Sequence, residues 1–212
     1  TAATVGNSTL TASTATVAAD GTSSTMTLQA KDANGNNLSA GGLTVEMSES
    51  GSATLNTVTD NNDGTYTATI KNTTAETVTV TAAIGGSNVT DTADVSFTVT
   101  AATVGNSTLT ASTATVDADG STTSTITLQA KDANGNNLSA GGLTVTMSQS
   151  GSATLSGVTN VGNGTYTATI KNTTAETVIV TAAFGGSNVT DTATVSFTVT
   201  AATVGNSTLT AS

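Results

Sequence analysis

Apolar and polar residues alternate along most of the chain, a pattern that predicts half-buried β-strands. In residues 25–31 every second residue is apolar, beginning with Met26. The same period predicts four further strands whose inward residues are Leu43, Val45 and Met47; Tyr66, Ala68 and Ile70; Val78, Val80 and Ala82; and Val95, Phe97 and Val99. Thr fills many of the outward positions, where a β-branched polar side chain suits a strand.

Turn-forming dipeptides separate these predicted strands. Asn34-Gly35 and Asp63-Gly64 are two of them, and glycine supplies a positive φ at little cost. Short strands that are separated by turns, with no helical periodicity between them, indicate an all-β antiparallel sandwich.

The sequence also repeats itself. Residues 1–13 read TAATVGNSTLTAS, and these letters recur at residues 100–112 and 200–212. A unit of about 100 residues is the size of an autonomous domain. We therefore expect two sandwiches arranged end to end, at residues 1–99 and 100–199, with residues 200–212 as the first strand of a truncated third repeat. The chain then reads as an excerpt from a longer tandem array.

Two motifs carry a family resemblance. The turn KDANGN occupies residues 31–36 and 131–136, and DGTYTATI occupies residues 63–70, with GTYTATI again at residues 164–170. Both units resemble the group 1 bacterial Ig-like domain of invasin- and intimin-type surface proteins. The resemblance implies an Ig-like fold, an extracellular location on a bacterial surface, and a place in a stalk that presents a binding module at its tip.

Composition narrows the classes of function. The chain has 4 Lys+Arg against 14 Asp+Glu and a net charge of −10. This balance argues against nucleic acid and anionic membrane as partners, because both attract clustered cations. The sequence has no Cys and no His, so it lacks thiols and the commonest general base.

Several acidic positions are candidates for a metal site. Asp32 opens a stretch with oxygen ligands at alternate positions, but the later positions of a calcium loop do not fit. The acidic loop at residues 60–64 loses both carboxylates in the second copy. Asp91 and Asp191 recur near the ends of the units, which leaves inter-domain calcium as an alternative. We otherwise predict turns, no metal site and no cofactor.

Catalysis is not indicated either. Glu46 and Glu49 could form a carboxylate pair, but the second copy has neutral residues at these positions. We predict no enzyme and no catalytic residue. Lys31, Lys71 and Glu76 recur in both copies and admit an internal Lys–Asn crosslink, although solvated lysines are the simpler interpretation.

Differences between the copies test the predicted faces. Glu46, Glu49 and Asp94 become neutral polar residues, as expected of outward positions. Thr79 becomes Ile179 on a face predicted to be exposed, so that face is covered or contacts a partner. The junction from Val99 to Leu109 contains no Pro and is predicted to continue the last strand almost directly into the next domain.

The leading hypothesis is therefore a structural spacer in a surface adhesin or extracellular filament. Its partners would be neighbouring repeats, with the host or surface ligand bound elsewhere in the parent protein. Two alternatives remain. The units could bind a ligand themselves, or the chain could polymerise by donating residues 200–212 as a strand to another copy.

Overall fold

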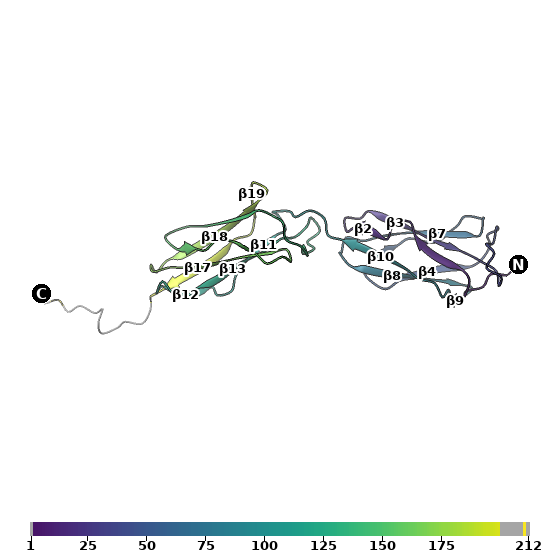
Figure 1. Ribbon diagram of the computed structural model, residues 1–212, viewed down its shortest axis with the longest axis horizontal. Coiled ribbons are helices and arrows are strands. Elements are labelled where there is room, and N and C mark those ends of the chain that lie inside the picture. Colours follow the sequence, from purple (N-terminus) through teal and green to yellow (C-terminus); the bar gives the residue numbers. More distant parts are fainter. Residues whose placement is uncertain (1, 200–209, 211–212) are drawn as a thin grey trace. The chain divides into compact units, whose positions relative to one another are not determined.

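The computed structural model describes residues 2–199 and residue 210, and it divides the chain into two units after Thr100. The described residues form strands, turns and irregular segments without helix. Within the described residues each unit contains ten strands, and Figure 1 labels several of them in each unit.

The strands of the two units correspond one to one. Those of the first unit are β1 (Thr9–Ala12), β2 (Thr16–Ala18), β3 (Ser23–Gln29), β4 (Val45–Glu49), β5 (Thr54–Leu55), β6 (Thr59–Asp60), β7 (Thr65–Lys71), β8 (Thr77–Ile84), β9 (Ser87–Asn88) and β10 (Ala93–Thr98). Those of the second are β11 (Thr108–Ala111), β12 (Thr115–Asp117), β13 (Ser124–Gln129), β14 (Val145–Gln149), β15 (Thr154–Leu155), β16 (Thr159–Asn160), β17 (Thr165–Lys171), β18 (Thr177–Phe184), β19 (Ser187–Asn188) and β20 (Ala193–Thr198).

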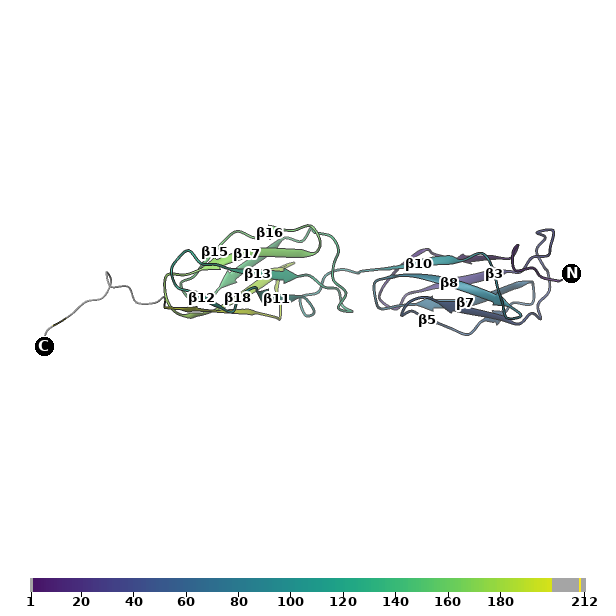
Figure 2. The same ribbon diagram turned by 90° about the horizontal axis from the view of Figure 1, so that it is seen from below.

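Two five-stranded sheets face each other in each unit. In the first unit one sheet has the order β1-β3-β7-β5, with β6 also paired to β7. The other has the order β2-β10-β8-β4, with β9 paired to β8. The second unit repeats this topology, and Figure 2 shows β13, β17 and β15 side by side in one of its sheets. The all-β, Ig-like sandwich predicted from the alternation is confirmed.

The inward residues of the central strands form the core of each sandwich. Tyr66 and Ile70 on β7 are almost fully buried, as are Val78 and Val80 on β8. The second unit buries the equivalent side chains in a core of its own. Because each core is complete within one unit, each sandwich has its own hydrophobic stabilisation.

Three details differ from the sequence prediction. β2 pairs with β10 in parallel, and β12 pairs with β20 in the same way, so the sheets are mixed. Val45 and Met47 are only half-buried, because β4 lies at the edge of its sheet. Glu49 shares their face and is half-buried too, so its predicted outward position is wrong.

The junction also differs from the prediction. β10 ends at Thr98 and β11 begins at Thr108, with irregular backbone between them. Within that segment Thr103 donates its backbone N–H to Lys131 of the second unit at 2.8 Å. The last strand therefore does not run directly into the next domain. The predicted third-repeat strand at residues 200–212 lies outside the described residues, apart from Thr210.

Candidate functional site

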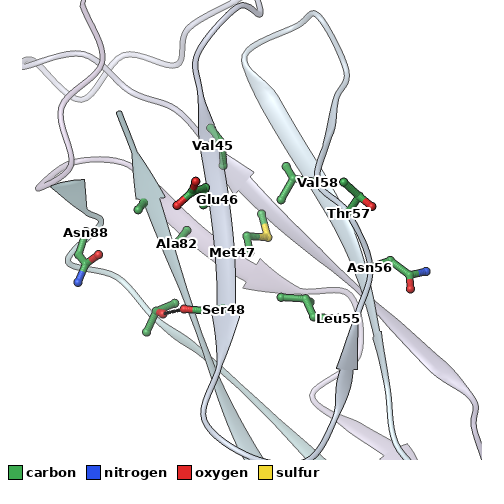
Figure 3. Close-up of a pocket in the computed structure, with 12 residues that line it drawn as sticks. Val45, Glu46, Met47, Ser48, Leu55, Asn56, Thr57, Val58, Ala82 and Asn88 are labelled. Carbon is green, nitrogen blue, oxygen red and sulfur yellow. Dashed lines mark hydrogen bonds between the residues drawn. The ribbon is translucent and has the colours of Figure 1, made fainter. Parts of the chain in front are cut away.

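A groove of about 630 Å³ opens along one side of the first sandwich, between β4 and residues 55–58 (Figure 3). Its apolar lining consists of half-buried side chains: Val45, Met47, Leu55 and Val58. Figure 3 shows Met47 directed from β4 toward Leu55 and Val58. The groove exists because β4 and β5 are the last strands of their sheets on this side, so no further strand covers the gap between the sheets.

Tyr66 holds the segment that leads into β4. Its side chain is buried, and its hydroxyl accepts a hydrogen bond from the backbone N–H of Leu43 at 3.0 Å. Tyr166 and Leu143 repeat the bond at 2.9 Å. The hydroxyl of each Tyr thus binds the backbone of a residue 23 positions upstream.

A second recurring contact surrounds Glu76. One of its carboxylate oxygens accepts hydrogen bonds from the backbone N–H of Ser52 at 2.8 Å and from Asn72 Nδ2 at 2.7 Å. Glu176 makes the same two bonds in the second unit, both at 2.7 Å. Bonds from Ser52 and Asn72 hold the pKa of Glu76 below its ordinary value, because they favour the charged form. The side chain of Lys71 is exposed. The hydrogen bonds described here join Glu76 to Ser52 and Asn72.

Asp32 closes the Asn34-Gly35 turn. Its Oδ1 accepts hydrogen bonds from the backbone N–H groups of Asn34 and Asn36, each at 2.9 Å. The Asn36 side chain and these N–H groups lower the pKa of the Asp32 carboxyl. The predicted turn is present at residues 33–35, and the Asp32 carboxylate organises its backbone.

The remaining acidic candidates also bind backbone. Asp60 accepts a hydrogen bond from the N–H of Gly42 at 2.7 Å, and Asp63 accepts one from the N–H of Thr65 at 2.9 Å. Asp91 accepts one from the N–H of Leu10 at 3.0 Å, which fastens β1 within its own unit. Among residues 2–199 and 210, no three His, Cys, Asp or Glu side chains gather where they could hold a metal ion.

Asp191 repeats the contact of Asp91. It accepts a hydrogen bond from the backbone N–H of Leu109 at 2.9 Å, within the second unit. The two carboxylates that suggested inter-domain calcium therefore fasten the first strand of their own sandwiches. Glu46 is exposed on β4, while Glu49 turns toward the backbone N–H of Gly51, so the structure does not arrange the two as facing carboxylates.

Differences between the copies gather in one stretch of the sequence, and three of them, at residues 46, 56 and 57, line the groove. Between residues 25 and 99 the second copy has twelve substitutions, and eight of them fall at residues 46–63. These eight positions lie in β4, directly after β5, in β6 and in the loop after β6. Sequence reasoning predicted that Val45 and Met47 face inward but missed the groove, which this clustering of substitutions could have indicated.

The described residues contain no helix long and apolar enough to cross a membrane.

The sequence pattern of the family "Invasin, domain 3" matches two segments of the chain, residues 4–100 and 103–200. The chain belongs to this family. The resemblance to invasin- and intimin-type Ig-like domains is thereby confirmed. No curated protein matches the chain significantly.

Solved structures of bacterial adhesins are similar to this member of the family. The crystal structure of invasin, described as a bacterial integrin-binding protein, is 30% identical, with a TM-score of 0.63 over 92% of this chain and 40% of invasin. The Escherichia coli adhesin FdeC is 30% identical, with a TM-score of 0.64 over 94% of this chain and 65% of FdeC. Yersinia pseudotuberculosis InvD is 26% identical, with a TM-score of 0.61 over 96% of this chain and 61% of InvD.

The chain therefore spans about two fifths to two thirds of the length of these structures. Its relatives are adhesin domains of bacterial surface proteins, and this invasin-type chain is likewise a bacterial surface segment, as the sequence predicted.

Proposed function

We propose that the two sandwiches are spacer repeats in the stalk of a bacterial surface adhesin, and that they act without a cofactor or catalytic activity. The observation that carries this proposal is the recurrence of the whole framework. The Tyr66, Glu76 and Asp91 contacts each have a counterpart in the second unit. A spacer needs a folded unit of fixed length, and copying such a unit extends reach without requiring a new site.

The neighbouring repeats of the same chain are then the direct partners, and the host or surface ligand binds elsewhere in the parent protein. Nucleic acid and membrane are not expected partners, because the chain carries a net charge of −10 and only four cations. Invasin is described as integrin-binding, but this chain covers only 40% of it. We therefore do not transfer that ligand to the two sandwiches.

The spacer role can be tested by placing one or two copies of the chain between an outer-membrane anchor and a reporter binding domain. Each added sandwich should move the reporter outward by about 35–45 Å, the length expected of strands of this size with their turns. The affinity of the reporter for its ligand should stay unchanged.

The isolated chain provides the matched control. Labelled chain should show no saturable binding to cultured host cells or to immobilised glycans. Saturable binding with a Kd below about 10 μM would contradict the spacer role. That Kd corresponds to a binding free energy of roughly −7 kcal/mol. Such binding would instead support the alternative, a ligand-binding adhesion module.

A further inference from the structure

The edge strand of the second unit has one side without a strand partner. Among the described residues β14 pairs only with β18. Ser150, directly after β14, donates its backbone N–H to Ile179 of β18 at 2.9 Å. Because successive residues of a strand point their backbone groups to opposite sides, Val145, Met147 and Gln149 direct theirs away from β18. These groups are available to another strand.

The equivalent edge in the first unit is protected by charge. Glu46 and Glu49 lie on β4 itself, while Asp60 and Asp63 lie on or after β6, which pairs with β7 in the facing sheet. Acidic side chains at a sheet edge discourage another strand from pairing there, because like charges would meet across the new pair. Nine of the fourteen carboxylates of the chain belong to the first unit.

The second unit has lost all four of these charges. The replacements are Thr146 for Glu46, Gln149 for Glu49, Asn160 for Asp60 and Asn163 for Asp63. Two residues that correspond to groove-lining residues of the first unit are also smaller, with Ser156 in place of Asn56 and Gly157 in place of Thr57.

Apolar surface also increases in the loop after β16. Val161 replaces Asn61 and is 53% exposed, while the groove lining of Val145, Met147, Leu155 and Val158 is kept. We use the name neutral edge for β14 together with Leu155, Val158 and Val161.

We propose that the neutral edge is a self-association surface, on which β14 of one copy pairs antiparallel with β14 of a second copy. The sequence Val-Thr-Met-Ser-Gln suits such a pair centred on Met147. Met147 then lies opposite Met147 of the other copy, and Val145 lies opposite Gln149. The outward-facing residues of this pair are Thr146 and Ser148, which are neutral and hydrogen-bonding.

This register also matches the free backbone groups. The three residues that face away from β18 are the same three that form the cross-strand hydrogen-bonded positions of the pair, giving about six new backbone hydrogen bonds. The Met147 side chains lie on the groove side, where they extend the apolar lining. In the first unit the same register would place Glu46 opposite Ser48 and Glu49 opposite Val45 of the other copy. Four carboxylates would then lie within one short strand pair, which opposes pairing.

Sedimentation velocity of the full chain tests this proposal. We expect a concentration-dependent dimer that strengthens as salt is raised, since the net charge of −10 is then screened. The double variant Thr146→Glu, Gln149→Glu restores the residues of the first unit and should weaken the dimer at least about tenfold. At concentrations where the parent chain is monomeric, the melting temperature of the variant should match that of the parent, because the first unit folds with these residues.

Cross-linking tests the register. The chain has no Cys, so a single introduced thiol reports one position. Met147→Cys should give a disulfide-linked dimer under mild oxidation, because directly opposite residues in an antiparallel pair have Cα atoms about 5.5 Å apart. Met47→Cys, at the same place in the charged edge, is the matched control and should give no disulfide-linked dimer.

Three results would overturn the proposal. They are a chain that stays monomeric at every concentration and salt, a dimer that is unaffected by the two introduced glutamates, and equal cross-linking of the Met147 and Met47 variants. None of these results bears on the spacer role, which concerns reach along the stalk and not pairing between chains.

Discussion

At the scale of single residues, glycine at residue 64 is required for two separate reasons. Its φ is 83°, in the left-handed region that L side chains rarely adopt. In addition, a Cβ at this position would overlap the backbone carbonyl of Leu38. The backbone oxygen of Gly64 also accepts a hydrogen bond from Ala30 at 3.0 Å, which ties the turn to the end of β3. The Asp63-Gly64 turn is therefore part of the packing as well as a chain reversal.

We expect Gly64→Ala to destabilise the first unit by about 2–5 kcal/mol, combining roughly 1–2 kcal/mol of left-handed strain with 1–3 kcal/mol of overpacking. Gly35→Ala is the matched control. Its φ is 82°, but a Cβ there meets no atom within 4 Å. It should cost only the strain, about 1–2 kcal/mol. Urea unfolding measures both values, and equal losses would show that the overlap with Leu38 is relieved cheaply.

The sequence identified both glycines as turn residues because their dipeptides have a known backbone preference. It could not distinguish them, since the close approach of Leu38 to Gly64 depends on tertiary packing. For the same reason the partner of the Tyr66 hydroxyl could not be read from the sequence: Leu43 lies 23 residues away.

At the scale of elements, the exposed pair between β8 and β10 has changed as a unit between the copies. In the first unit the Thr79 hydroxyl donates a hydrogen bond to Asp94 at 2.7 Å. In the second unit Ile179 is 46% exposed and lies opposite Thr194. An aliphatic β-branched residue beside Thr is a favourable cross-strand pair, so Ile179 needs no partner outside its sheet.

A double-mutant cycle tests this coupling. Thr79→Ile alone should destabilise the first unit, because Asp94 loses its donor and faces an apolar side chain. Adding Asp94→Thr should recover part of the loss, with a coupling free energy of about 0.2–1 kcal/mol. The measurement is thermal unfolding of the two single variants and the double variant. Simple additivity of the two single effects would show that the residues are independent.

Strand positions were predictable because period-two alternation reports which face is buried. The position of a strand within its sheet was not, since alternation carries no information about neighbours. β4 illustrates the difference: its inward residues were identified, but its place at an edge, and hence the half-burial of Met47 and Glu49, came from the topology. The parallel pairing of β2 with β10 was missed for the same reason.

At the scale of the whole molecule, charge is distributed unevenly between two units with the same framework. The first carries a net charge of −7 and the second −3, because the second lacks the carboxylates at residues 46, 49, 60, 63 and 94 of the first and gains Asp117. The recurring carboxylates are the ones with backbone partners in both units, such as Glu76 and Asp91 with their counterparts. Backbone bonds alone do not separate the two sets, because Asp60 and Asp63 also accept backbone hydrogen bonds in the first unit and are replaced in the second.

These recurring contacts predict how stability depends on pH. The pKa of Glu76 and that of Glu176 are both lowered from the ordinary 4.5, first by the side-chain bonds from Ser52 and Ser152. A carboxyl with a lowered folded pKa contributes stability that is present above its unfolded pKa and is lost as pH falls through the folded value. Because the chain has no His, the melting temperature should be nearly constant from about pH 8 to pH 5 and should decline below about pH 4.5.

The double variant Glu76→Gln, Glu176→Gln separates this contribution from general acid effects. It should melt at a lower temperature at pH 7 and lose less on acidification, since the two stabilised carboxylates are gone. Glu46→Gln removes a charge from an exposed position of β4 and controls for the change in net charge. Calorimetry at several pH values gives both profiles. A double variant that declines as steeply as the parent chain would assign the acid sensitivity to other carboxylates, with Asp32 and its turn the next to test because the pKa of Asp32 is also lowered.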